Sequence, residues 1–122
     1  MSTNWSDDIV VAQLDDEPAL SDELATIQDK LDAMEGDRTP HVVLDFDKVS
    51  YVNSSNIAQL LNLRKTLEPA GRQMRLSAVR GEVWAVMQTT GLDRVLAFSP
   101  DTMTALAMLQ LGADAAGADD EA

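Results

Sequence analysis

Short apolar runs that suit β-strands alternate in this sequence with longer runs that suit α-helices. The strand-like runs lie at residues 8–14, 39–46, 72–79 and 94–98. The second of them contains VVL and is apolar enough to be covered on both faces of a sheet. Strands joined by helices through short turns form a largely parallel or mixed sheet with right-handed crossovers. The sequence therefore predicts an α/β fold in which a mixed, partly parallel β-sheet is flanked by helices.

Four helical segments are predicted from apolar residues that recur every three or four positions. The first, residues 20–36, is expected to begin at a Ser21 cap and to end at Gly36. The last, residues 99–112, is expected to begin at a Ser99 cap with Pro100 in its first turn. The residues expected to face the core are, helix by helix, Leu20, Leu24, Ile27, Leu31 and Met34; Ile57, Leu60, Leu61 and Leu67; Val83, Trp84 and Met87; and Met103, Leu106 and either Leu109 or Gln110.

Length and composition indicate one domain that folds without disulfides or a structural metal. The chain has 122 residues, enough for a core of its own, and it has no cysteine. The domain is predicted to span residues 7–111, between a disordered N-terminus at 1–6 and a disordered acidic tail at 112–122. No signal peptide is recognisable and no apolar run is long enough to cross a bilayer. The protein is therefore expected to be cytoplasmic, with no direct insertion into a membrane.

The net charge of −12 argues against partners that are themselves polyanions. Binding to nucleic acid or to anionic lipid depends on Lys and Arg that displace counterions, so no nucleic-acid partner is expected. Asp45 and Asp47 lie at alternate positions where a strand ends and could together hold a metal. Acids at the end of a strand are more often simply solvated. Neither a metal nor a cofactor is predicted.

Four small uncharged polar residues, Asn53-Ser54-Ser55-Asn56, lie where an extended segment passes into the second helix. Asn53 or Ser54 can cap that helix, and a cap needs only one residue. Hydrolases also present a nucleophilic serine at such a junction. Here the flanking glycines are missing and His41 is the only candidate base, so the chain is not expected to be an enzyme. A phosphate-binding loop is excluded because no glycine-rich run ends in lysine.

Residues 41–109 resemble a STAS domain, the module of bacterial anti-sigma factor antagonists. The resemblance includes the apolar strand HVVLDFD, the segment VSYV, the polar motif NSSN before a leucine-rich helix, GRQMRL, and TTGLDRVLAF. The family motif is typically Asp-Ser-Ser/Thr-Gly. This sequence has Asn53 in place of the Asp and Asn56 in place of the Gly.

The resemblance implies regulation by partner switching. The second hydroxyl residue of the family motif is phosphorylated, and it corresponds to Ser55, with Ser54 as the alternate site. Without phosphate, such a domain binds an anti-sigma factor that is itself a GHKL-type serine kinase. Phosphorylation abolishes that binding, and a metal-dependent serine phosphatase restores it. The alternative is a STAS scaffold subunit of a transport or stressosome-type assembly, in which no phosphate cycles.

A partner-binding surface is predicted around the N-terminus of the second helix. Its expected residues are Asn53, Ser54, Ser55, Asn56, Gln59 and Asn62. Ser54 is expected to cap the helix, whereas Ser55, one position further on, is expected to point to solvent and carry the switch. This division assigns Ser54 to stability and Ser55 to signalling.

Overall fold

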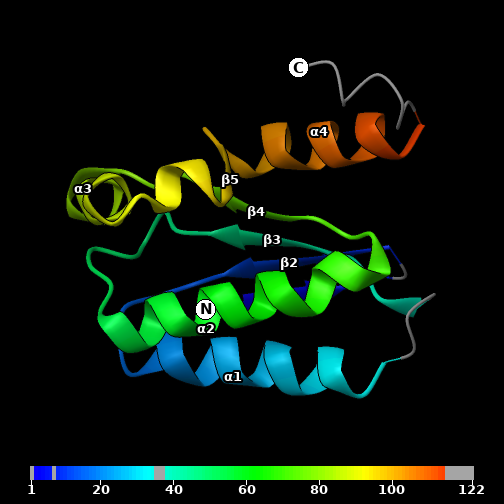
Figure 1. The fold of residues 1–122 in the computed structure, drawn as a ribbon, viewed down its shortest axis with the longest axis horizontal. Coiled ribbons are helices and arrows are strands. Elements are labelled where there is room, and N and C mark those ends of the chain that lie inside the picture. Colours follow the sequence, from blue (N-terminus) through cyan, green and yellow to red (C-terminus); the bar gives the residue numbers. More distant parts are fainter. Residues whose placement is uncertain (1, 7, 35–37, 115–122) are drawn as a thin grey trace.

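The computed structural model describes residues 2–6, 8–34 and 38–114, and its strands form one mixed sheet (Figure 1). The strands of the described residues are β1 (Ser2–Trp5), β2 (Ile9–Gln13), β3 (His41–Asp45), β4 (Met74–Ser77) and β5 (Ala97–Ser99). They lie in the order β1-β2-β3-β4-β5. β1 is antiparallel to β2, and the other neighbours are parallel. The predicted α/β fold with a mixed, partly parallel sheet is confirmed.

Helices cover both faces of this sheet. They are α1 (Ala19–Asp32), α2 (Ser54–Leu67), α3 (Gly81–Thr90) and α4 (Thr102–Asp114), with short 3-10 turns at Glu68–Ala70 and Leu92–Arg94. Figure 1 shows α1 and α2 side by side on one face and α4 on the other. Because β2 to β5 are parallel, their carboxyl ends meet at one edge, and the turns into all four helices start there.

The core has two parts because successive residues of a strand point to opposite faces. Val42 and Leu44 of β3 belong to the larger part, together with buried residues of α1, α2 and α3. Val43, between them in sequence, packs with Ala105 and Leu109 of α4. The side chains of Val42, Val43 and Leu44 are all fully buried, as expected for a strand covered on both faces.

The N-terminus is more ordered than the sequence indicates. Disorder over residues 1–6 is wrong for the described part, because Ser2 to Trp5 pair with β2 as an edge strand. Trp5 packs against the larger core, and the Lys30 ammonium lies 4.7 Å from the centre of its ring. Thr3 donates a hydrogen bond to the Glu23 carboxylate. Backbone pairing carries this strand, and STNW has no apolar alternation that would have indicated it.

At the C-terminus, α4 continues to Asp114, so residues 112–114 of the expected tail are helical. The rest of that tail, 115–122, lies outside the described residues. The expected Ser99 cap is wrong, because Ser99 is a buried residue of β5. Asp101 caps α4 instead, since its carboxylate accepts a 2.7 Å hydrogen bond from the Thr104 backbone N–H. Met103 is 80% exposed, and the buried positions of α4 are Ala105 and Leu109.

Candidate functional site

The polar motif at residues 53–56 forms a capping box at the start of α2. Asn53 precedes the helix, and its side-chain Oδ1 accepts a 2.9 Å hydrogen bond from the backbone N–H of Asn56. In return, Oδ1 of Asn56 accepts a 3.0 Å bond from the backbone N–H of Asn53. Each side chain thus satisfies a backbone donor that a helix start leaves open. The expectation that Ser54 caps the helix is wrong: Ser54 is its first residue and Ser55 its second.

Asn56 is fully buried, although it was expected on the partner-binding surface. Its side-chain nitrogen lies 3.1 Å from Oε2 of Glu17 and 3.3 Å from Oγ of Ser21, at the start of α1. Gln59 also contacts α1, through a 3.0 Å bond from its Nε2 to the Ser21 carbonyl. The amides of Asn56 and Gln59 therefore hold α1 and α2 together. Asn56 therefore has no exposed surface in this chain to offer a partner.

Glu17 connects the two helix starts. Its carboxylate accepts a 2.7 Å bond from the Ser21 backbone N–H, a further bond from the Ser21 hydroxyl, and a 3.4 Å bond from Nδ2 of Asn53. Hydrogen bonds from the Ser21 hydroxyl, the Ser21 N–H, Asn56 and Asn53, in that order, lower the pKa of Glu17. Ser21 was expected to cap α1 itself. Instead, its N–H and hydroxyl both donate to Glu17, before the helix.

Ser54 and Ser55 remain free at the surface. Both are exposed, and within the described residues neither hydroxyl has a hydrogen-bond partner. Their backbone N–H groups are the first two of α2, which have no acceptor inside the helix. Such N–H groups and the positive end of the helix dipole favour an anion. A phosphate attached to either serine would find donors beside it.

The corrected cap gives a stability prediction. Asn53→Ala is expected to lower the free energy of unfolding by about 1 kcal/mol, because it removes the cap acceptor. Ser54→Ala is expected to cost less than about 0.5 kcal/mol, because the exposed hydroxyl bonds nothing. Urea denaturation of both variants beside the parent measures the difference. If Ser54→Ala lowered the free energy of unfolding by as much as about 1 kcal/mol, Ser54 would contribute to the cap after all.

The exposed face of α2 contains an apolar residue at its centre. Its exposed residues are Ser54, Ser55, Ala58, Leu61, Asn62 and Lys65. Leu61 was expected in the core, but it is 37% exposed, and the buried positions are Asn56, Leu60, Leu63 and Leu67. In the segment before the helix, Tyr51 is 46% exposed. We call Tyr51, Ser54, Ser55, Ala58, Leu61 and Asn62 the switch face.

The acidic residues near this edge are held by protein groups. Asp16 accepts bonds of 2.8 and 2.7 Å from the backbone N–H and hydroxyl of Ser50, and the bond from the hydroxyl contributes most to lowering the pKa of Asp16. Asp45 accepts a 2.9 Å bond from the N–H of Asp47, and Asp47 pairs with Arg80. Within the described residues no group of three or more His, Asp and Glu side chains is placed to hold a metal ion. These contacts hold the segment from Asp45 to Ser50, which leads into the switch face.

His41 lies far from the two serines along the sheet. It is the first residue of β3, whereas the chain reaches Ser54 from the carboxyl end of the same strand. Its Nδ1 accepts a 3.0 Å bond from the backbone N–H of Gln73 and is thereby occupied. A Ser–His pair, which needs hydrogen-bond contact, is therefore not formed. Burial, and then the positive charge of Arg72, lower the pKa of His41 against an opposing effect of Asp8.

The lowered pKa of His41 predicts a loss of stability in mild acid. Its ordinary value is 6.5, so the unfolded chain takes up the proton before the folded chain does. The stabilising contribution is present above that pH and is lost as the pH falls toward the folded value. His41→Asn keeps an acceptor near Nδ1 without titrating there. Melting curves between about pH 7 and pH 5 should fall more steeply for the parent than for this variant; parallel curves would contradict the shift.

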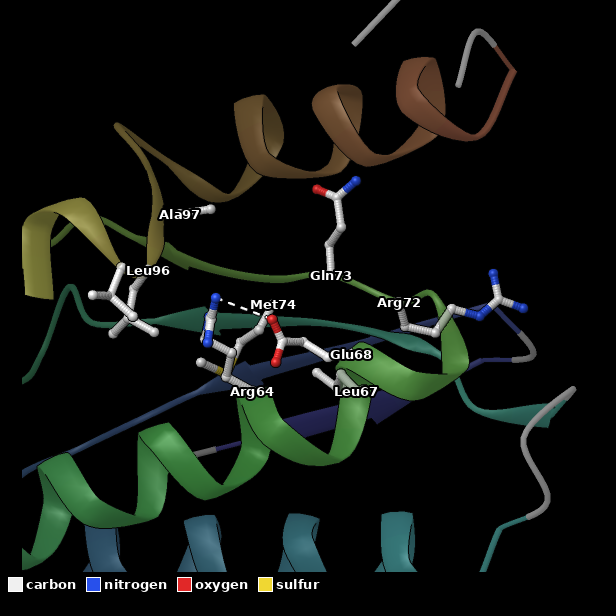
Figure 2. Close-up of a pocket in the computed structure, with 9 residues that line it drawn as sticks. Arg64, Leu67, Glu68, Arg72, Gln73, Met74, Leu96 and Ala97 are labelled. Atoms are coloured by element: carbon white, nitrogen blue, oxygen red, sulfur yellow. Dashed lines mark ion pairs between the residues drawn. The ribbon is translucent and has the colours of Figure 1, made fainter. Parts of the chain in front are cut away.

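A cleft of about 190 Å³ lies at the opposite end of α2 (Figure 2). Leu67, Met74 and Leu96 line it, and Arg64 forms a 3.1 Å ion pair with Glu68 at its side. Figure 2 shows the Arg72 guanidinium directed away from this ion pair. Arg64 and Leu67 belong to the last turns of α2, whereas Ser54 and Ser55 begin it. The cleft is therefore separate from the switch face.

Comparison with known families and structures places this geometry in context. The family model of the STAS domain matches residues 9–105, which includes every element from β2 to the first turn of α4. The chain belongs to the STAS domain family. No curated protein matches it in sequence. Within the described residues, no helix of this STAS domain is both long and apolar enough to span a membrane.

Several solved structures share its fold. An anti-sigma-factor antagonist (STAS) domain protein from Planctomyces limnophilus is 17% identical over 89% of this chain and 97% of that chain, with a TM-score of 0.75. A sulfate transporter family protein from Wolinella succinogenes is 19% identical over 87% and 88%, with a TM-score of 0.72. The phosphorylated form of the Bacillus cell fate determinant SpoIIAA is 19% identical over 80% and 89%, with a TM-score of 0.60. At these identities the similarity establishes the fold alone.

Proposed function

We propose that this STAS domain is an anti-sigma factor antagonist that acts by phosphorylation-controlled partner switching. Without phosphate on Ser55, it binds a GHKL-type anti-sigma factor that is also a serine kinase. Phosphorylation of Ser55 ends that binding, and a metal-dependent serine phosphatase restores it. The observation that carries the proposal is the Ser55 hydroxyl, exposed and unpartnered among the described residues at a helix N-terminus. The chain itself has no catalytic role in this cycle.

The physical chemistry of the junction suits such a switch. A phosphate near the first N–H groups of α2 gains about 0.3 to 1 kcal/mol from the helix dipole, so the fold tolerates it. The same phosphate adds a charge of about −1.5 to −2 to the surface. A docked partner would have to desolvate that charge beside Ala58 and Leu61. Phosphorylation therefore acts on the interface and leaves the core intact.

The switch face has the composition of a docking surface. Interfaces combine apolar or aromatic anchors with a polar rim, and exposed Tyr51 and Leu61 can serve as those anchors. Ser54, Ser55 and Asn62 supply the polar positions around them. Asn53 lies at the margin, where its side chain is engaged by Asn56 and Glu17. Asn56 and Gln59 support the face from behind.

Capture from an extract of the source organism tests the proposal. The purified, unphosphorylated domain is the bait, and a GHKL-type kinase identified by mass spectrometry is the expected prey. The matched control bait is Leu61→Asp, which places a charge on the switch face and is expected to reduce recovery at least about tenfold. Because Leu61 is 37% exposed and aspartate is a poorer helix former than leucine, the variant is expected to lose about 1 to 2 kcal/mol of unfolding free energy, and circular dichroism checks that it stays folded. Recovery of transporter or stressosome-type subunits without a kinase would support the scaffold alternative.

A further inference from the structure

Glu17 lies beside the motif that contains Ser55, so a phosphate on Ser55 would change the electrostatic environment of the Glu17 carboxylate. Its carboxylate joins the start of α1, through Ser21, to the start of α2, through Asn53 and Asn56. Asn53 is two residues from Ser55, and Asn56 is adjacent to it. Both are the positions at which this chain departs from the Asp and Gly of the family motif. An Asp at position 53 could accept the N–H of Asn56, but it could not donate to Glu17 as the amide of Asn53 does.

We infer that Glu17 couples phosphorylation of Ser55 to the junction of α1 and α2. A phosphate on Ser55 and the Glu17 carboxylate are like charges at one helix start, and they repel each other. The repulsion makes the dianionic phosphate less favourable and weakens the bonds that the side-chain amides of Asn53 and Asn56 donate to Glu17. Glu17 is thus a positioning residue that senses the switch. The biological meaning of this inference rests on the proposed function.

The surrounding groups single out Glu17 as the charge in contact with the motif. The carboxylate of Asp16, next to Glu17 in sequence, accepts its hydrogen bonds from Ser50, in the loop that leads into α2. The first turn of α2 has no acidic residue, and the acidic residue in the first turn of α1 is Asp22, which is exposed. The lowered pKa of Glu17 comes from hydrogen bonds and keeps the carboxylate charged at neutral pH. No such bond joins Asp22 to the motif among the described residues.

The test uses a chain in which phosphoserine is incorporated at position 55 during translation, so that no kinase is needed. A phosphorus NMR titration then measures the pKa of the second phosphate ionisation, ordinarily about 6. At low salt, Glu17→Gln is expected to lower this pKa by about 0.2 to 0.4 pH unit, the effect of one charge at roughly 8 to 10 Å in water. The matched control Asp22→Asn removes the same charge from α1 and is expected to change this pKa clearly less than Glu17→Gln does, because Asp22 is exposed to solvent and makes no bond to the motif among the described residues.

A second readout reports the coupling at the motif itself. In the phosphorylated parent, the side-chain amide signals of Asn53 and Asn56 should shift as the phosphate ionises, and in Glu17→Gln they should shift less. If Glu17→Gln fails to fold, Glu17→Asp retains the charge and should keep the phosphate pKa of the parent. Equal phosphate pKa values for the parent and Glu17→Gln would overturn the inference. So would an Asp22→Asn shift of the same size, or a phosphate pKa in Glu17→Asp that is lower than that of the parent by about 0.2 pH unit or more. Failure of the proposed function would appear separately, in the capture experiment.

Discussion

Asn56→Ala is expected to lower the free energy of unfolding by about 2 to 3 kcal/mol. The substitution leaves the backbone N–H of Asn53 without its acceptor and removes the donor to Glu17 and Ser21. Unpaired buried polar groups cost about 1 to 3 kcal/mol, and the truncated side chain leaves space at a fully buried position. Urea denaturation monitored by circular dichroism measures the loss.

The matched control is Asn62→Ala, the same substitution on the same helix. Asn62 is exposed, so its loss is expected to stay below about 0.5 kcal/mol. Comparing the two variants therefore separates the role of a buried asparagine that joins α1 to α2 from that of an exposed asparagine on the switch face. If Asn62→Ala destabilised the domain as much as Asn56→Ala, the polar network between α1 and α2 would not hold the motif.

Ser55→Asp is expected to weaken binding to the captured kinase at least about tenfold, which corresponds to about 1.4 kcal/mol. Aspartate carries less charge than phosphate, so binding is reduced and not abolished. The fold should be as stable as the parent, because a negative charge in the first turn complements the helix dipole. Ser55→Ala should bind like the parent.

Ala107→Asp is the control for charge alone. Ala107 is exposed on α4, which covers the opposite face of the sheet (Figure 1). The same added charge there should leave affinity unchanged in calorimetric titration. An equal loss of affinity for Ala107→Asp and Ser55→Asp would mean that net charge, and not the switch face, controls binding.

The fold could be predicted because its elements follow simple periodicities. β3 is a continuous apolar run, and α1 buries Leu20, Leu24, Ile27 and Leu31 at the predicted positions. These patterns depend on burial alone, which the side-chain types reveal directly. β1 was missed because an edge strand is held by backbone pairing, which places little demand on its side chains.

The polar site was harder to predict because its partners are remote in sequence. α2 buries positions 56, 60, 63 and 67, a regular helical stripe, but its first member is an asparagine. Hydrophobicity favoured Leu61 instead. The partners of Asn56 in the interior include Glu17 and Ser21, 39 and 35 positions earlier, which local sequence patterns do not reveal. The two serines were placed at the helix start correctly, but the cap was assigned to Ser54 because serine and asparagine are equally good caps.

The most direct test of partner switching is to map the phosphate itself. The purified domain is incubated with the captured kinase and Mg²⁺-ATP, and peptides are sequenced by tandem mass spectrometry. We predict one phosphoryl group, on Ser55, with none added to Ser55→Ala and normal addition to Ser54→Ala. Phosphate on Ser54 in the parent, or an unmodified chain after prolonged incubation with an active kinase, would contradict it.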